Sequence, residues 1–338
     1  MIATAPSGDT PAPPGWWARL PPAAGSTVMA TGIVSVGLHL VGRSVLSGIL
    51  LVVAAAVWIL LATAFALTFL RDRKQWTAHA DTPPALTAVA ATAVLGTRLS
   101  LFGWQGVAAA LLVIAAAAWP GLLAAVLRHW HHHMPGAAFL VCVATEGLAV
   151  LSGTLALAHH GTWLIWPALV AFVLGIGLYV AALTRFDLRQ VTTGPGDHWI
   201  AGGALAICAL AATKLTAWPS WTGAAHTALR TTTLVLLTLD LAWYLVLFTA
   251  EIRHPRLHYN IRRWATVFPL GMTAVATLST STAAHIAWLR PVGQVLLWIA
   301  VAAWLLTAAL LVADTVLRRE APPEKVSVGQ PTGRRLGG

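Results

Sequence analysis

The stretch LSGILLVVAAAVWILLATAFALTFL, residues 46–70, contains no charged residue and is apolar almost throughout. A helix needs roughly 20 mostly apolar residues to cross the hydrocarbon core of a bilayer, which is about 30 Å thick. Because this run is longer than that and has no polar face, it predicts a transmembrane helix.

The whole chain has the same character. Hydrophobic residues make up 58% of its 338 residues, charged residues only 9%, and the mean hydropathy is +0.75. A soluble globular chain is about one quarter charged. The composition therefore predicts one integral membrane domain at residues 23–317. The proline-rich residues 1–22 are expected to form a disordered cytoplasmic leader that is not a cleaved signal peptide, and residues 318–338 a disordered cytoplasmic tail.

Further apolar runs follow at regular intervals and predict an all-α membrane protein with ten transmembrane helices. We expect the spans at residues 23–41, 46–70, 85–103, 104–127, 136–158, 163–184, 198–217, 225–250, 264–285 and 290–317.

Basic residues fall unequally on the two sides of the membrane that these spans define. Of the 21 lysines and arginines, sixteen lie in the ends and connections of one side, and only Arg43 and Arg290 lie in connections of the other. Cytoplasmic loops of membrane proteins carry an excess of Lys and Arg. We therefore expect a multi-pass protein of the cell membrane with both termini cytoplasmic. Since the topology accounts for most of the net charge of +10, no nucleic-acid partner is expected.

The outer connections are very short, so consecutive spans are expected to form five helical hairpins. Odd-numbered spans carry many small and hydroxylated residues, whereas the second and fourth are nearly pure aliphatic sequence. Small and polar residues in membrane helices favour close packing or the wall of a wet cavity. We expect odd helices to surround a central pore and even helices to face lipid, although single small residues can serve packing alone. The expected lining includes Thr31, Gly32, Ser35 and Thr273.

The ionisable residues that lie well inside predicted spans are Arg98, Glu146, Lys214, Arg230 and Asp240. A charge in the bilayer is costly, so these groups should face protein, water or one another. Arg98, Lys214 and Arg230 lie toward the outer ends of their spans, where cations attract anions. We expect Arg98, Lys214 and Glu146 to lie at the pore; an ion pair of Glu146 with Arg98 or Lys214 is the alternative.

Neither a catalytic nor a metal-binding signature stands out. The run RHWHHH at 128–133 lacks the i, i+4 spacing of helical ligands and reads as a solvated loop, so His131–His133 are not expected to bind metal. Cys142 and Cys208 lie in apolar runs and read as core residues, with a disulfide improbable. We expect no cofactor and no enzyme activity.

Two segments carry a family resemblance: VMATGIVS at 28–35 and RRWATVFPLGMTAVAT at 262–277. With ten spans in hairpins, the chain resembles the tellurite-resistance/dicarboxylate transporter family, which includes yeast malate permeases, sulfite efflux pumps and plant slow anion channels. The resemblance implies a pseudo-fivefold barrel, assembly as a homotrimer and an aromatic gate on the ninth helix. The matching position is Phe268, directly before Pro269, a residue type that can kink a helix.

Together these features predict transmembrane transport of small anions, with C4-dicarboxylate, sulfite or related oxyanions as the substrates that the resemblance implies. Glu146 would suit a proton-coupled carrier, whereas a channel does not require it. A membrane-embedded enzyme and a sensor or scaffold without transport remain the alternatives.

Overall fold

The computed structural model describes residues 20–255 and 259–320, and these ranges are helical with no strand. Residues 1–19 of the expected leader and 321–338 of the expected tail lie outside the described residues. Within the described ranges, nine helices are long and apolar enough, by length and composition, to cross a membrane. They are α1 (Gly25–Leu40), α2 (Ser44–Arg71), α4 (Thr87–Leu101), α5 (Gln105–Arg128), α6 (Leu140–Leu157), α7 (Ile165–Leu183), α9 (Ile200–Thr216), α10 (Gly223–Arg253) and α12 (Leu289–Glu320).

A further helix, α11 (Trp264–Ala283), occupies the place of the expected ninth span. Its 20 residues include several threonines and serines, one proline and one glycine, and it is not among the nine. It packs against α1, α9 and α12 and is buried almost throughout. Protein therefore surrounds α11 on most sides, which allows a polar composition that lipid would not tolerate.

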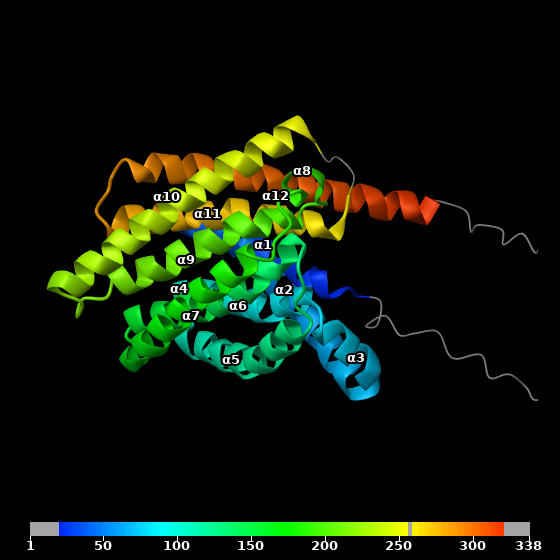
Figure 1. Cartoon of the computed structure of the whole chain (residues 1–338), viewed down its shortest axis with the longest axis horizontal. Coiled ribbons are helices and arrows are strands. Elements are labelled where there is room, and N and C mark those ends of the chain that lie inside the picture. The colour runs from blue at the N-terminus through cyan, green and yellow to red at the C-terminus, as the bar shows by residue number, and fades with distance from the viewer. Residues whose placement is uncertain (1–19, 256–258, 321–338) are drawn as a thin grey trace, which may run out of the picture.

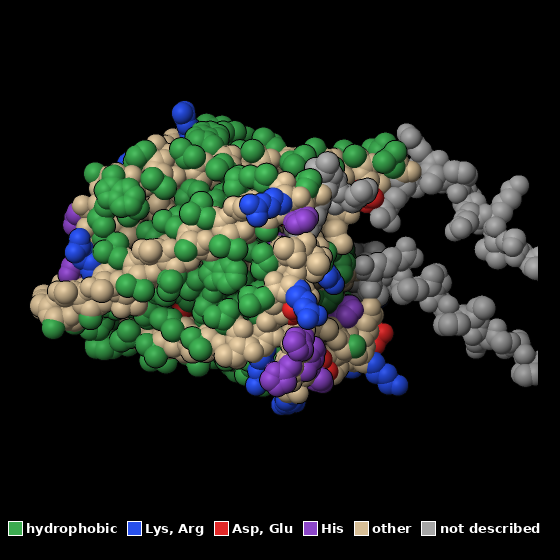
Figure 2. Space-filling view, turned by 45° about the horizontal axis from the view of Figure 1, so that its top comes forward, with side chains coloured by type: hydrophobic (Ala, Val, Ile, Leu, Met, Phe, Trp, Pro, Cys, Tyr) green, Lys and Arg blue, Asp and Glu red, His purple; other side chains and the backbone are tan. Residues whose placement is uncertain are grey.

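Burial divides the long helices into two classes. The spans that contain α1, α4, α6 and α9 are between 78% and 94% buried, and those that contain α2, α5, α7, α10 and α12 are between 17% and 33% buried. The buried class, with α11, holds the small and hydroxylated residues. Figure 2 shows hydrophobic side chains over the middle of one face, with Lys, Arg and His toward its ends, as expected for a surface that contacts lipid.

The five buried helices contact one another in a closed order: α1 with α4, α4 with α6, α6 with α9, α9 with α11, and α11 with α1. We call this arrangement the inner ring. Each inner helix also packs against the outer helix that follows it in the chain, such as α1 against α2 and α11 against α12. The long helices run roughly along the longest axis of the molecule (Figure 1), and the outer helices pack around the inner ring.

Most of the short helices join the long ones at one end of the bundle, and the 3-10 turn Thr162–Leu164, between α6 and α7, lies at the other. The longest is α3 (Arg73–Ala80), whose start is capped by the Asp72 side chain, which accepts a hydrogen bond from the backbone N–H of Gln75. The sequence reading did not predict α3. The others are α8 (Gln190–Thr193) and single 3-10 turns, including Pro83–Leu86, where proline begins the turn.

Candidate functional site

A narrow cavity of about 20 Å³ lies on the axis of the inner ring, and all five inner helices contribute to its wall. Its volume is enough for one water molecule at most. The lining residues are Ile33, Val36, Ala93, Val94, Thr97, Gly147, Val150, Ile207, Leu210 and Met272. Most are aliphatic, so the axis is closed here by an apolar constriction, which we call the collar.

Phe268 lies one helical turn before Met272 on α11, and residues four apart share a helix face. Its side chain is therefore on the face of α11 that meets the axis, and it is 1% exposed. Phe268 lies in the first two turns of α11, roughly 6 Å from Trp264 along the axis of that helix. The aromatic residue and the collar thus form two successive layers.

Pro269, the next residue, packs against α9. A Cβ atom added to Gly203 would lie 2.8 Å from Cγ and 3.1 Å from Cα of Pro269, closer than such atoms approach. Only glycine lets α9 and α11 come this close. The contact fixes the position of α11 beside Phe268.

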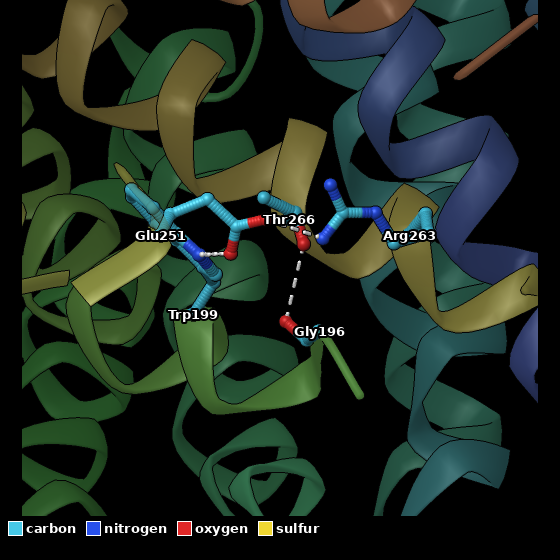
Figure 3. A network of polar contacts seen from close by, with 5 residues as sticks. All are labelled: Gly196, Trp199, Glu251, Arg263 and Thr266. Atoms are coloured by element: carbon cyan, nitrogen blue, oxygen red, sulfur yellow. Dashed lines mark hydrogen bonds and ion pairs between the residues drawn. The ribbon is translucent and has the colours of Figure 1, made fainter. Parts of the chain in front are cut away.

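A polar network holds the beginning of α11 (Figure 3). Arg263 donates a 2.8 Å hydrogen bond from Nη1 to Oε1 of Glu251, and the indole of Trp199 donates to Oε2 at 3.4 Å. The hydroxyl of Thr266 donates to the carbonyl oxygen of Gly196 at 3.3 Å. The network joins three parts of the chain: α10, the segment that precedes α9, and the start of α11. It lies directly before the turn of α11 that carries Phe268.

Lys214 lies in the last turn of α9, four residues after Leu210 of the collar. The base of its side chain packs on α6, since a Cβ atom added to Gly153 would lie 2.9 Å from Cβ of Lys214, and Lys214 is not among the residues that line the narrow cavity. Lys214 is partly exposed in an otherwise buried helix, and its ammonium group has no hydrogen-bond or ion-pair partner among the described residues. A free ammonium group in this position can attract an anion.

Arg98 is 2% exposed and lies between α1, α2 and α4. Its Nε donates to the hydroxyls of Ser35 and Ser47 at 3.1 Å and 3.0 Å, and its Nη2 donates to Ser47 at 2.8 Å. Nη1 has no partner in the described structure. Arg98 and Ser35 therefore belong to a buried cluster between helices and are not among the residues that line the narrow cavity.

The remaining small and polar residues expected at the pore also contact neighbouring helices. Thr31 accepts a 3.0 Å hydrogen bond from the indole of Trp304, and Thr273 donates at 3.1 Å to Asp240. A Cβ atom on Gly32 would lie 2.8 Å from Val94. At the level of the collar, the wall is built from other residues of the same helices, among them Ile33 and Val36.

Glu146 lies beside Cys142 and Cys208. The sequence did not predict that these three residues are close together. The Sγ atoms of Cys142 and Cys208 are 3.6 Å apart, both thiols are free, and one carboxylate oxygen of Glu146 lies within 4.8 Å of each sulfur. In the described structure neither carboxylate oxygen has a hydrogen-bond partner and Glu146 forms no ion pair with Arg98 or Lys214. The three donors form the one group in the described ranges with metal-ligand spacing; His131–His133 do not form another.

These features define a class: a membrane protein whose described residues are helical and whose inner helices surround a narrow cavity. The sequence profile of the voltage-dependent anion channel family matches residues 19–312, and the chain belongs to that family. It is therefore a multi-pass membrane protein of an anion channel family, as the two quoted segments indicated.

Two curated relatives are uncharacterised membrane proteins from two strains of Mycobacterium tuberculosis. Each is 29% identical to this chain over 141 residues, which covers 38% of this chain and 69% of the relative.

Proposed function

We propose that the protein conducts small anions across a cell membrane along the axis of the inner ring. The observation that carries this proposal is the axial cavity whose wall is shared by all five inner helices. Membership of the voltage-dependent anion channel family supports anions as the transported species. Lys214, which has no partner among the described residues, would raise the local concentration of anions at one mouth.

The proposal includes ten spans in five hairpins, with α11 as the ninth span in chain order. Its support is that α11 has 20 residues and completes the ring between α9 and α1. The distribution of Lys and Arg supports cytoplasmic termini. The homotrimer that the family resemblance implies is part of the same proposal.

The gate in this proposal has two layers, Phe268 and the collar. A hydrophobic constriction stops ions because it cannot replace their hydration shell. Movement of α11 would shift Phe268 and Met272 together, since both lie on one face of that helix. Small oxyanions, C4-dicarboxylate or sulfite are the proposed substrates.

The test is flux of radiolabelled anions into proteoliposomes of purified protein, with and without imposed pH and voltage gradients. We expect chloride, nitrate, sulfite or malate to enter above the level of empty vesicles. Dependence of flux on the pH gradient, lost in Glu146→Gln, would identify a proton-coupled carrier rather than a channel. An embedded enzyme or a scaffold would give no flux of any of these anions, and that result would overturn the proposal.

A further inference from the structure

A second cavity, of about 380 Å³, lies between α2, α4 and α5, and residues 20–22 and the start of α1 complete its wall. Its wall is almost entirely apolar; Trp58, Leu61, Phe65, Trp76, Val89 and Ala118 are representative. We call it the lateral slot. It belongs to no part of the axial path.

The lateral slot runs along the membrane-spanning part of α2. One end lies at Trp58, 13 residues before Arg71 and near the middle of the helix, and the other lies beside α3. Thirteen residues of helix cover roughly 20 Å. Water is disfavoured over most of this space, because it needs two to four polar partners and the wall is mainly apolar. Within a bilayer, the molecules available to occupy the slot are the acyl chains of lipids.

At the α3 end, Phe65, Trp76 and His79 line the slot, and Phe69 and Arg73 lie next to Trp76. The ring of Trp76 contacts the rings of Phe65 and Phe69, with centroids 5.7 Å and 5.1 Å apart, and the guanidinium carbon of Arg73 lies 3.8 Å from the centroid of Phe69. His79, one turn after Trp76, lines the slot. Aromatic rings and cations of this kind are typical of the membrane–water interface.

From the apolar wall and the cationic side chains at the α3 end, we propose that the lateral slot binds an anionic phospholipid. One acyl chain fills the slot, and the phosphate lies against Arg73 and His79. The charge at this end determines the class of lipid, because a cation near the membrane surface favours anionic headgroups. The bound chain would contact α4, a helix of the inner ring, where Trp58 donates a 2.8 Å hydrogen bond to Thr92.

The test measures bound lipid and does not depend on anion flux. The full chain is reconstituted in vesicles of phosphatidylcholine and phosphatidylglycerol, solubilised in mild detergent and purified, and the retained lipid is quantified by mass spectrometry. We expect phosphatidylglycerol to be enriched over its share of the vesicles. Ala118→Trp, which fills the slot, should abolish the enrichment, whereas Ala116→Trp, on the exposed side of α5, should retain it.

The headgroup contact has its own pair of variants. Arg73→Gln should lower the preference for phosphatidylglycerol about fivefold, the change that corresponds to one interfacial cation. Lys74→Gln removes the same charge from another face of α3 and should have a smaller effect. Equal retention in wild type and Ala118→Trp would overturn the proposal and would favour occupation of the slot by the chain's own residues 1–19 or by a second copy. Equal effects of Arg73→Gln and Lys74→Gln would overturn the phosphate assignment.

Discussion

Phe268 and Met272 lie one turn apart on the axial face of α11, so each should hinder an ion on the proposed path. Phe268→Ala and Met272→Ala are expected to raise anion flux per folded molecule, because each removes part of an apolar barrier. Leu270→Ala is the matched control: it removes a buried side chain from another face of α11. It should lower stability by about 2–5 kcal/mol without raising flux. Vesicle flux measured together with thermal unfolding in detergent separates these effects. Loss of stability without a gain in flux for Phe268→Ala would assign Phe268 to packing.

Lys214 and Arg98 both lie within predicted spans, but Lys214 is partly exposed and Arg98 is buried, so different results are expected of their variants. Lys214→Gln should reduce the preference of the path for anions about fivefold, since two charges 4 Å apart in water interact by about 1 kcal/mol. Arg98→Gln should mainly destabilise the protein, because it removes hydrogen bonds to Ser35 and Ser47. Reversal potentials in a salt gradient and melting temperatures of both variants provide the check. A larger change of selectivity in Arg98→Gln than in Lys214→Gln would contradict this assignment.

Single residues were the hardest part to predict from the sequence. The presence of charges within the spans was evident, but their partners depend on how helices cross, which places Arg98 beside Ser47 and Glu146 beside Cys208. The collar was missed because its members are ordinary aliphatic residues. One signal was available: Met272 follows Phe268 by one turn, so a gate at Phe268 implied an axial position for Met272.

Helices were predicted more accurately than the partners of single residues, because hydropathy and composition are averaged over many residues. Long aliphatic runs predicted outer helices such as α2 and α5, and these are largely exposed. Helices rich in small and hydroxylated residues are those that the structure buries. Connections were predicted less well, since α3 has the composition of a loop and depends on the Asp72 cap and on aromatic contacts with α2.

The crossing of α9 and α11 provides a test at this scale. Gly203→Ala places a methyl group against Pro269 and should destabilise the protein by about 1–3 kcal/mol. Gly48→Ala on α2 meets no atom within 4 Å and should be neutral or stabilising by up to about 1 kcal/mol, because alanine is the better helix former. Detergent melting curves of both variants compare them directly. If Gly203→Ala lowers the melting temperature no more than Gly48→Ala does, the close contact between α9 and α11 is not required for stability.

For the whole molecule, orientation in the membrane is the first prediction to check. Cysteine at His160 should react with an impermeant thiol reagent added outside, and cysteine at His132 should react only after permeabilisation. Both positions are exposed, and the native Cys142 and Cys208 are fully buried. His160 is a better site than Gly161, whose φ of +85° disfavours a side chain. Labelling in the opposite sense would reverse the proposed topology.

The membrane class and the approximate spans could be predicted for the whole chain, because hydropathy depends on composition alone. The order of contacts in the inner ring depends on which faces meet, and the family resemblance supplied that expectation. The lateral slot could not be predicted, since its wall combines α2, α4, α5 and the start of α1, and no single helix specifies it.

The contact between α1 and α11 joins the first inner helix to the last. During synthesis α1 leaves the ribosome long before α11 does, so the ring stays an open arc while the intervening helices enter the bilayer. Until α11 arrives, the flanks of α1 and α9 that it covers must be shielded by lipid, by the insertion machinery or by one another. Because non-local contacts form last, closure of the ring is expected to be the late step of biogenesis. A chain interrupted before residue 264 would therefore be an unclosed arc, and not a smaller channel.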